Sequence, residues 1–317
     1  MPDPLLSIRN LRIEATVHAP GEPSREVVIV DDVSLSLDRG KVMGLIGESG
    51  AGKSTIGLSA LAYGRGGIRL TGGTITLNNR EIRLADAATL RSLRGREVTY
   101  VAQSAAAAFN PAKRLMEQVI EATLHHGLMS REAAEARAVD LFRTLSLPDP
   151  ETIGQRYPHQ VSGGQLQRAM TAMALCPKPD LVIFDEPTTA LDVTTQIDVL
   201  AAIKTAIAQT GVAALYITHD LAVVAQVSDE IMVLRHGKMV EHGTVQQIIE
   251  APRQDYTRAL ISVRSIEHTE KPPSAQPLLV VQNVSARYGA MAKDVLSNVS
   301  VQVHPGQTLA LVGESGS

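Results

Sequence analysis

Short apolar runs, separated by polar and amphipathic stretches, recur along the first part of the chain. Val42–Ile46, Leu181–Phe184 and Ala213–Ile217 are almost wholly apolar, and each ends in polar or glycine-rich residues, which is typical of buried central strands. Alternating apolar positions in Val27–Leu37 predict strands that precede them. Because such runs alternate with helical stretches, we expect an α/β fold with a largely parallel core.

Helical patterns follow the first of these runs. Apolar spacing predicts helices at Leu115–His125 and Arg131–Leu145, and Ser130 suits the N-cap of the second. We interpret residues 104–165 as a separate helical lobe. A hairpin is expected later, from two short segments joined by a tight turn: Ile231–Leu234, Arg235–Gly237 and Lys238–Glu241.

The beginning of the chain recurs near its end. Three segments reappear in the same order: Leu5–Leu11 as Leu278–Val284, Val33–Leu37 as Val299–Val303, and Gly47–Gly50 as Gly313–Gly316. We therefore predict one complete domain at residues 1–264, a polar and proline-rich linker at 265–277, and the start of a second domain at 278–317. Ser317 aligns with Ala51, so the second copy is expected to be truncated inside its glycine-rich motif.

Charge, cysteine content and the length of apolar runs limit the classes of protein to which the chain can belong. The 30 basic and 33 acidic side chains give a net charge of −3, so general attraction to nucleic acid is a poor first hypothesis. Cys176 is the single cysteine and cannot form an internal disulfide, which favours a reducing compartment. No apolar run approaches the roughly 18 residues of a membrane span, and Met1–Glu14 lacks the pattern of a secretion signal. These features predict a cytoplasmic protein.

The glycine-rich sequence after Val42–Ile46 fits a phosphate-binding loop, G-x-x-x-x-G-K-[ST]. Its residues are Gly47, Glu48, Ser49, Gly50, Ala51, Gly52, Lys53 and Ser54. Glycines allow backbone N–H groups to surround phosphate oxygens, Lys53 can reach the β- and γ-phosphates, and Ser54 can ligate Mg²⁺. A simple glycine-rich turn between a strand and a helix is the alternative.

Two acids, Asp185 and Glu186, directly follow Leu181–Phe184, so both are expected at the carboxyl end of a strand. Magnesium needs a carboxylate there, and hydrolysis needs a second acid that orients or deprotonates water. We assign Asp185 to the metal and Glu186 to the role of base. A strand that ends in two solvated acids is the alternative.

A third motif, formed by Ser162, Gly163, Gly164 and Gln165, opens a helix predicted to run to about Leu175. Ser-x-x-Gln is a capping box, in which two side chains satisfy backbone N–H groups. An exposed serine followed by glycines at a helix start can also bind an anion. The two interpretations coexist, because such a site can serve a phosphate held by another subunit.

Together these motifs resemble the ATP-binding cassette (ABC) ATPases, the nucleotide-hydrolysing subunits of ABC transporters. The motifs occur in the order of that family: the phosphate loop Gly47–Thr55, the Q-loop Gln103, the signature Val161–Gln165, the acids Asp185 and Glu186, the D-loop Ala190–Asp192 and the switch histidine His219. The resemblance implies an α/β P-loop NTPase with a RecA-like parallel-sheet core, an N-terminal antiparallel β subdomain and a helical subdomain.

The resemblance also implies a site shared by two cassettes. Glu186, His219 and Gln103 would be catalytic, and Ser54, Gln103 and Asp185 would hold the metal. The residues implied to bind ATP are the phosphate loop from Gly47 to Thr55, the signature residues Ser162, Gly163, Gly164 and Gln165, and Asp192. In this arrangement the signature completes the site of the opposite cassette.

The implied cofactors are ATP and Mg²⁺. The implied partners are a second ABC cassette, identical or different, membrane permease subunits and, indirectly, a solute-binding protein, with no nucleic acid. The helical lobe would dock the permease. The protein is therefore expected at the cytoplasmic face of the bacterial inner membrane.

Further segments resemble importers of the oligopeptide, dipeptide and nickel type: Gly-Glu-Ser-Gly in both glycine-rich loops, Phe109–Pro111, Pro158–His159 and Asp255–Leu260. The implied function is ATP-driven import of peptides or related small solutes. Val161 replaces the family's usual leucine. His18 is the only candidate in the first copy for the aromatic that stacks on adenine, whereas Tyr288 takes that place in the second. No cysteine cluster is present, so no iron–sulfur centre is expected.

Two other functions stay open. A cassette ATPase that acts on DNA or ribosomes would need coiled-coil heptads, zinc cysteines or a basic surface, and the sequence shows none of these. A non-catalytic interaction module would be expected to lose Lys53 or Glu186, and both are present. A catalytically incomplete fragment is a further alternative. Because the second copy has no lysine, signature or acid, we expect hydrolysis to need two copies of the first domain.

Overall fold

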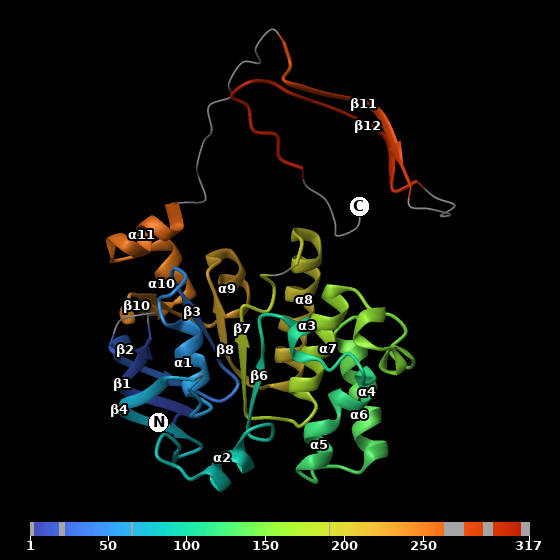
Figure 1. The fold of residues 1–317 in the computed structure, drawn as a ribbon. Coiled ribbons are helices and arrows are strands. Elements are labelled where there is room, and N and C mark those ends of the chain that lie inside the picture. The colour runs from blue at the N-terminus through green and yellow to red at the C-terminus, as the bar shows by residue number, and fades with distance from the viewer. Residues whose placement is uncertain are drawn as a thin grey trace. The chain divides into compact units, whose positions relative to one another are not determined.

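The computed structural model describes residues 3–18, 23–64, 66–189, 191–262, 276–287 and 294–311. The chain divides into two units (Figure 1). The first consists of Met1–Leu191 and Thr195–Ile261, and the second of Asp192–Thr194 and Ser262–Ser317. Among the described helices, none combines the length and the apolar character that a membrane span requires.

A six-stranded sheet forms the centre of the first unit (Figure 1). Its strands lie in the order β10 (Lys238–Thr244), β9 (Glu230–Arg235), β3 (Val42–Ile46), β8 (Ala213–Thr218), β7 (Leu181–Asp185) and β6 (Val98–Val101). Neighbours from β9 to β6 are parallel, and β10 pairs antiparallel with β9. Ile46 pairs with Thr218, and Asp185 with Ile217. The carboxyl ends of β3, β7 and β8 therefore reach one edge of the sheet.

Both faces of this sheet are covered, because successive strand residues point to opposite sides. Val182 and Phe184 of β7 belong to one buried cluster, together with residues of the helices, and Leu181 and Ile183 belong to another. The helices on the first side include α3 (Ala105–Ala108), α4 (Leu115–Val119), α5 (Glu121–His125), α6 (Arg131–Thr144), α7 (Gly163–Leu175), α8 (Val193–Thr210) and α9 (Leu221–Val227), with 3₁₀ turns at Ile153–Gln155 and Pro158–Gln160.

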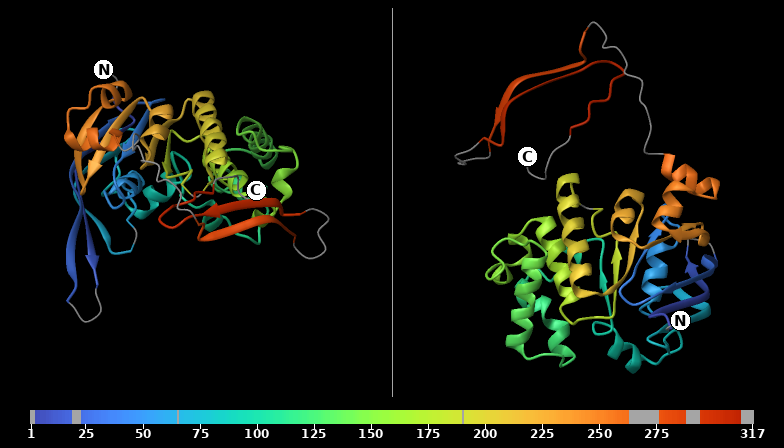
Figure 2. Two further views of the ribbon diagram at one scale, coloured as in Figure 1. Left: turned by 90° about the horizontal axis from the view of Figure 1, so that it is seen from above. Right: turned by 180° about the vertical axis from the view of Figure 1, so that it is seen from behind.

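The second cluster is closed by α1 (Lys53–Ser59) and an antiparallel sheet. That sheet has the order β2 (Arg25–Leu37), β1 (Leu6–Val17), β4 (Ile68–Leu77) and β5 (Arg80–Glu81). Figure 2 shows β1 and β2 extending together beyond the other elements of this unit. Three further helices complete the first unit: α2 (Ala87–Leu93), α10 (Val245–Glu250) and α11 (Asp255–Ser262).

The second unit contains a two-stranded antiparallel pair, β11 (Leu279–Ala286) and β12 (Leu296–Val303). Leu279 pairs with Val303 just as Leu6 pairs with Leu37 in the first copy. Both strand pairs also contain a shift in register, after Ile8 in the first copy and after Val281 in the second. The Asn10 N–H donates to Ser34 Oγ in the first copy, and the Asn283 N–H donates to Ser300 Oγ in the second. The sequence repeat is thus also a repeat of strand register.

Most of the expected elements are confirmed, as is the α/β fold class. Ser130 Oγ accepts the Ala133 N–H and caps α6, and the hairpin of β9 and β10 turns at His236 and Gly237, which both have positive φ. The helical stretch expected at Leu115–His125 is confirmed, and it is divided at Ile120 into α4 and α5. Ile120 is fully buried, α4 packs mainly against α7, and both α4 and α5 contact α6.

Several sequence-based expectations fall outside the described residues. These are the linker at 265–275, Tyr288, the second glycine-rich motif at 313–316, Ser317 and the D-loop residue Ala190. The predicted domain boundaries at 264 and 278 stay predictions.

Candidate functional site

Four of the predicted motifs meet at one edge of the six-stranded sheet (Figure 1). The glycine-rich loop follows β3, Gln103 follows β6, Asp185 ends β7, and His219 follows β8. These strands are parallel neighbours. Residues far apart in the sequence therefore gather where parallel strands end, which is the usual position of ligand sites in such sheets.

Glycine is required at two positions of the loop. A side chain at Gly47 would place its Cβ 2.1 Å from the Leu234 carbonyl oxygen, so β9 permits no side chain there. Gly52 precedes α1 with φ of +93°, a left-handed conformation that L-residues avoid. The loop therefore turns sharply against β9 before it enters α1.

The Lys53 side chain folds back into this loop and forms hydrogen bonds with its backbone. Its Nζ donates to the carbonyl oxygens of Gly47, at 2.8 Å, and Glu48, at 2.9 Å, and the residue is only 5% exposed. Burial lowers the pKa of the Lys53 ammonium group, and the negative charges of Glu186 and Asp185 partly oppose this shift. A cation is thus held at the centre of the loop, beside two acids.

Ser54 and Asp185 face each other across the edge of the sheet. Ser54 Oγ donates to Asp185 Oδ1 at 2.7 Å, and Tyr100 of β6 donates through its hydroxyl to Asp185 Oδ2 at 2.5 Å. Asp185 is 6% exposed, so the alternative of a solvated strand-end acid is wrong for this residue. Its two oxygens are held by donors from two different elements.

Glu186 lies between three other side chains. Gln103 Nε2 donates to Glu186 Oε2 at 3.3 Å, and Thr189 Oγ1 donates to the same oxygen at 3.0 Å. His219 Nδ1 lies 3.4 Å from Glu186 Oε1. Glu186 has φ of +48°, and its N–H donates to the Ile217 carbonyl oxygen at 2.9 Å. The backbone turns sharply here, and the carboxylate is directed toward Gln103 and His219.

The signature residues cap α7. Ser162 Oγ accepts the Gln165 N–H, and Gln165 Oε1 accepts the Ser162 N–H, which is the predicted capping box. A Cβ at Gly164 would come within 2.3 Å of Thr195 Cγ2, so α7 and α8 are in close contact there. Among the described residues, no hydrogen bond or ion pair joins Ser162–Gln165 to the glycine-rich loop.

Two further predicted site residues are Asp192 and His18. Asp192 immediately precedes α8. His18 follows β1, where its Nδ1 lies 2.7 Å from Ser24 Oγ.

Sequence reasoning missed two tyrosines. Besides Tyr100, Tyr256 of α11 contacts the loop, because its hydroxyl accepts the Glu48 N–H at 3.3 Å. The guanidinium carbon of Arg235 lies 4.6 Å from the centre of the Tyr256 ring. Tyr256 belongs to a segment that had only indicated a subfamily, and nothing in its sequence signalled a contact with the loop.

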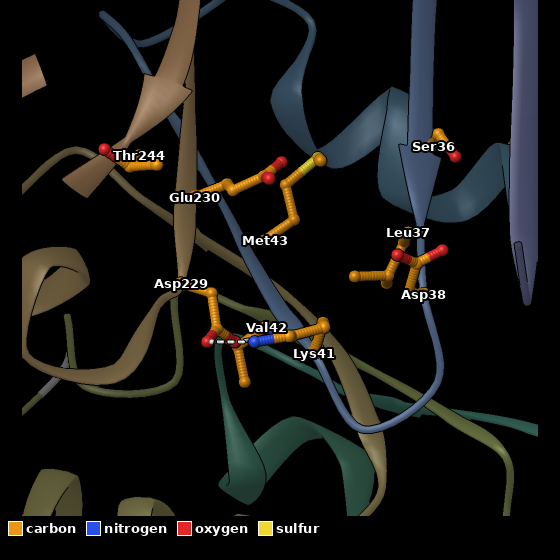
Figure 3. Close-up of a pocket in the computed structure, with 9 residues that line it drawn as sticks. All are labelled: Ser36, Leu37, Asp38, Lys41, Val42, Met43, Asp229, Glu230 and Thr244. Carbon is orange, nitrogen blue, oxygen red and sulfur yellow. Dashed lines mark hydrogen bonds and ion pairs between the residues drawn. The ribbon is translucent and has the colours of Figure 1, made fainter. Parts of the chain in front are cut away.

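A cavity of about 240 Å³ lies at the opposite end of β3 (Figure 3). Lys41 and Val42 line it, and Lys41 Nζ is 3.1 Å from Asp229 Oδ1. The remaining lining residues are Ser36, Leu37, Asp38, Met43, Glu230 and Thr244. None of the predicted motif residues lines this cavity, so it is separate from the motif cluster.

Comparisons with known proteins agree with these motifs. Residues 30–189 match the family model described as ABC transporter. The chain is 36% identical over 360 aligned residues to the glutathione import ATP-binding protein GsiA of Escherichia coli strain K12, and equally to that of Shigella boydii serotype 4. Each alignment covers 99% of this chain and 56% of the relative, so the chain spans little more than half the length of these proteins.

Solved structures show the same fold. The dimeric structure of a post-hydrolysis state of the ATP-binding cassette MJ0796, bound to ADP and Pi, superposes with a TM-score of 0.64 at 24% identity. A second dimeric structure of MJ0796, a bacterial ABC transporter cassette, gives the same TM-score at 25% identity. Each match covers 76% of this chain and 98% of MJ0796. By its matched sequence, its motifs and its fold, the chain belongs to the ABC transporter family.

Proposed function

We propose that the chain binds ATP with Mg²⁺ at the glycine-rich loop and hydrolyses it. The observation that carries the proposal is the convergence of Lys53, Ser54, Asp185, Glu186 and His219 at one sheet edge. When ATP binds, the Lys53 ammonium group leaves the carbonyl oxygens of Gly47 and Glu48 and pairs with the β- and γ-phosphates. The negatively charged phosphate oxygens are stronger acceptors than the carbonyl oxygens. The loop N–H groups hold the remaining phosphate oxygens.

The residues around Ser54 fit a magnesium ion. Ser54 Oγ and Asp185 Oδ1 are oxygen donors 2.7 Å apart, and oxygen ligands are those that Mg²⁺ prefers. An ion bound there would neutralise phosphate charge during transfer. Gln103 contacts Glu186 in this structure, and its proposed role at the metal requires its side-chain oxygen to turn toward the phosphates.

Glu186 acts on water in this proposal. Its carboxylate would accept a proton from, or orient, the water that attacks the γ-phosphorus, while His219 would hold that water and a phosphate oxygen in line. The new bond to phosphorus replaces the bond to the bridging oxygen, and ADP leaves with that oxygen. Ser162–Gln165 and Asp192 contribute to the site of a second cassette. The proposed catalytic role of Gln103 is to couple the presence of the γ-phosphate to the position of the Glu186 carboxylate, with which its side chain forms a hydrogen bond.

At the level of the cell, we propose that this ATPase drives an importer of peptides or related small solutes. The similarity to proteins named for glutathione import supports this class. Its partners are a second cassette, membrane permease subunits docked on the helices between Gln103 and Ser162 and, indirectly, a solute-binding protein. In this proposal the chain works at the cytoplasmic face of the bacterial inner membrane.

Two assays test the proposal. The purified chain is expected to release phosphate from ATP only when Mg²⁺ is present, and co-expressed permease subunits with their binding protein and a peptide substrate are expected to stimulate that release. Stimulation by DNA or ribosomes in place of the permease would favour the non-transport alternative. A chain that does not bind ATP at millimolar concentration would contradict the proposal as a whole.

A further inference from the structure

Asp185 is contacted by a residue that lies outside every motif. Tyr100 sits on β6 and pairs in register with Ile183, two residues before Asp185 on the neighbouring strand β7. Its hydroxyl donates to Asp185 Oδ2 at 2.5 Å, whereas Ser54 Oγ donates to Asp185 Oδ1 at 2.7 Å. Each carboxylate oxygen is therefore held by a separate donor.

Burial makes these bonds strong. Asp185 is 6% exposed, and hydrogen bonds to an ionised group are stronger than neutral ones, more so where water is excluded. The Tyr100 ring packs against the buried cluster between the two sheets. Because that packing fixes the ring, the hydroxyl has little freedom to leave the carboxylate.

We propose that Tyr100 is a positioning residue for the divalent cation of the nucleotide site. By holding Oδ2, it prevents rotation of the Asp185 carboxylate and leaves Oδ1 directed at Ser54, where the cation binds. Partners that orient metal-ligating carboxylates contribute to metal affinity although they do not touch the metal. This inference rests on the proposed function, since it concerns the same phosphate and metal site.

The position of Tyr100 gives the contact a second consequence. Gln103 lies three residues further along the same segment and contacts Glu186. The strand that carries the Q-loop is thus tied directly to the metal-binding acid. A purely packing role for Tyr100 would make no use of the hydroxyl, so removal of that one atom separates the two interpretations.

Tyr100→Phe is the test, and Tyr63→Phe is the matched control. Tyr63 is 45% exposed, and its ring lies beside Arg94. Binding of fluorescent ADP is followed as MgCl₂ is titrated, and again in EDTA. We expect Tyr100→Phe to raise the Mg²⁺ concentration at half-saturation about tenfold, to leave ADP affinity in EDTA within about twofold, and Tyr63→Phe to match the unchanged chain in both titrations.

A second variant makes the test independent of general damage to the fold. In an Asp185→Asn background, Tyr100→Phe is expected to change the Mg²⁺ midpoint less than twofold, because the charged partner is already gone. An unchanged or lower midpoint in Tyr100→Phe, or equal effects in both backgrounds, would overturn the inference. If the unchanged chain does not bind ADP with Mg²⁺, the proposed function itself fails, so the two failures are distinguishable.

Discussion

Glu186 is placed by its backbone as well as by its side chain. A left-handed conformation at a residue other than glycine costs about 1–3 kcal/mol and persists only where surrounding contacts determine it. Here the Glu186 N–H bonds to Ile217, and the carboxylate meets Gln103, Thr189 and His219. The chain thus holds an acid away from the strand direction, at the position where the proposed water attacks.

The first prediction concerns this carboxylate. Glu186→Gln keeps the shape of the side chain but removes the group that orients or deprotonates water, so phosphate release is expected to fall about a hundredfold or more. ATP affinity, measured by calorimetry, is expected to stay within about threefold. Near-normal turnover would show that Glu186 is not the base.

A second prediction concerns Lys53. Lys53→Ala removes the buried cation that faces the proposed phosphates, and ATP affinity is expected to fall about tenfold or more. Lys41→Ala is the control, because Lys41 pairs with Asp229 at the opposite end of β3 and should leave ATP affinity unchanged. Equal ATP affinity in calorimetry of Lys53→Ala and the unchanged chain would remove Lys53 from the site.

At the residue scale, spacing in the sequence indicated the loop and the acids, because each motif is local. Tyr100 and Tyr256 could not be found in this way. Their contacts depend on the register of β6 against β7 and on the packing of α11 beside the loop. Neither can be derived from local spacing, since both are set by tertiary packing.

At the scale of elements, α6 and α7 begin in the same manner. Ser130 accepts the Ala133 N–H, and Ser162 accepts the Gln165 N–H, each at 3.3 Å. Both serines are exposed. One geometry therefore serves two different roles in our interpretation, since only Ser162 is proposed to face a phosphate of another subunit.

An aspartate at each cap separates these roles. Aspartate caps a helix about as well as serine, so Ser162→Asp and Ser130→Asp are both expected to keep the unfolding free energy within about 0.5 kcal/mol in urea titrations. The added carboxylate repels a phosphate at Ser162 alone. ATP hydrolysis is expected to fall at least tenfold in Ser162→Asp and to persist in Ser130→Asp, and equal activities would leave Ser162 with a capping role only.

Some helices and strands could be predicted from the sequence pattern, and others could not. Buried strands such as β3, β7 and β8 were predictable because their runs are short, apolar and bounded by turns. The break between α4 and α5 was not, because the apolar pattern continues through Ile120. Ile120 is fully buried at that break, so the apolar spacing of the sequence carries no sign of it.

At the scale of the whole molecule, the first unit holds two separated parts of one proposed site. The glycine-rich loop leads into α1, the signature begins α7, and strands β6 to β8 lie between those helices (Figure 1). Among the described residues no bond joins the two motifs. We therefore expect the signature to contact a nucleotide held by the loop of another chain, as in a symmetric pair.

This arrangement leads to a test by complementation. Lys53→Ala damages the loop and Ser162→Asp damages the signature, so at subsaturating ATP each variant alone is expected to keep no more than about a tenth of the activity. In a mixed pair, one site combines both defects and the other is intact. Random pairing then leaves roughly a quarter of the sites whole, and an equal mixture is expected to recover hydrolysis toward that level.

In the dilute range, activity of the unchanged chain should also rise more steeply than linearly with protein concentration. A mixture no more active than its components, together with constant specific activity on dilution of a monomer, would show that one chain completes the site by itself.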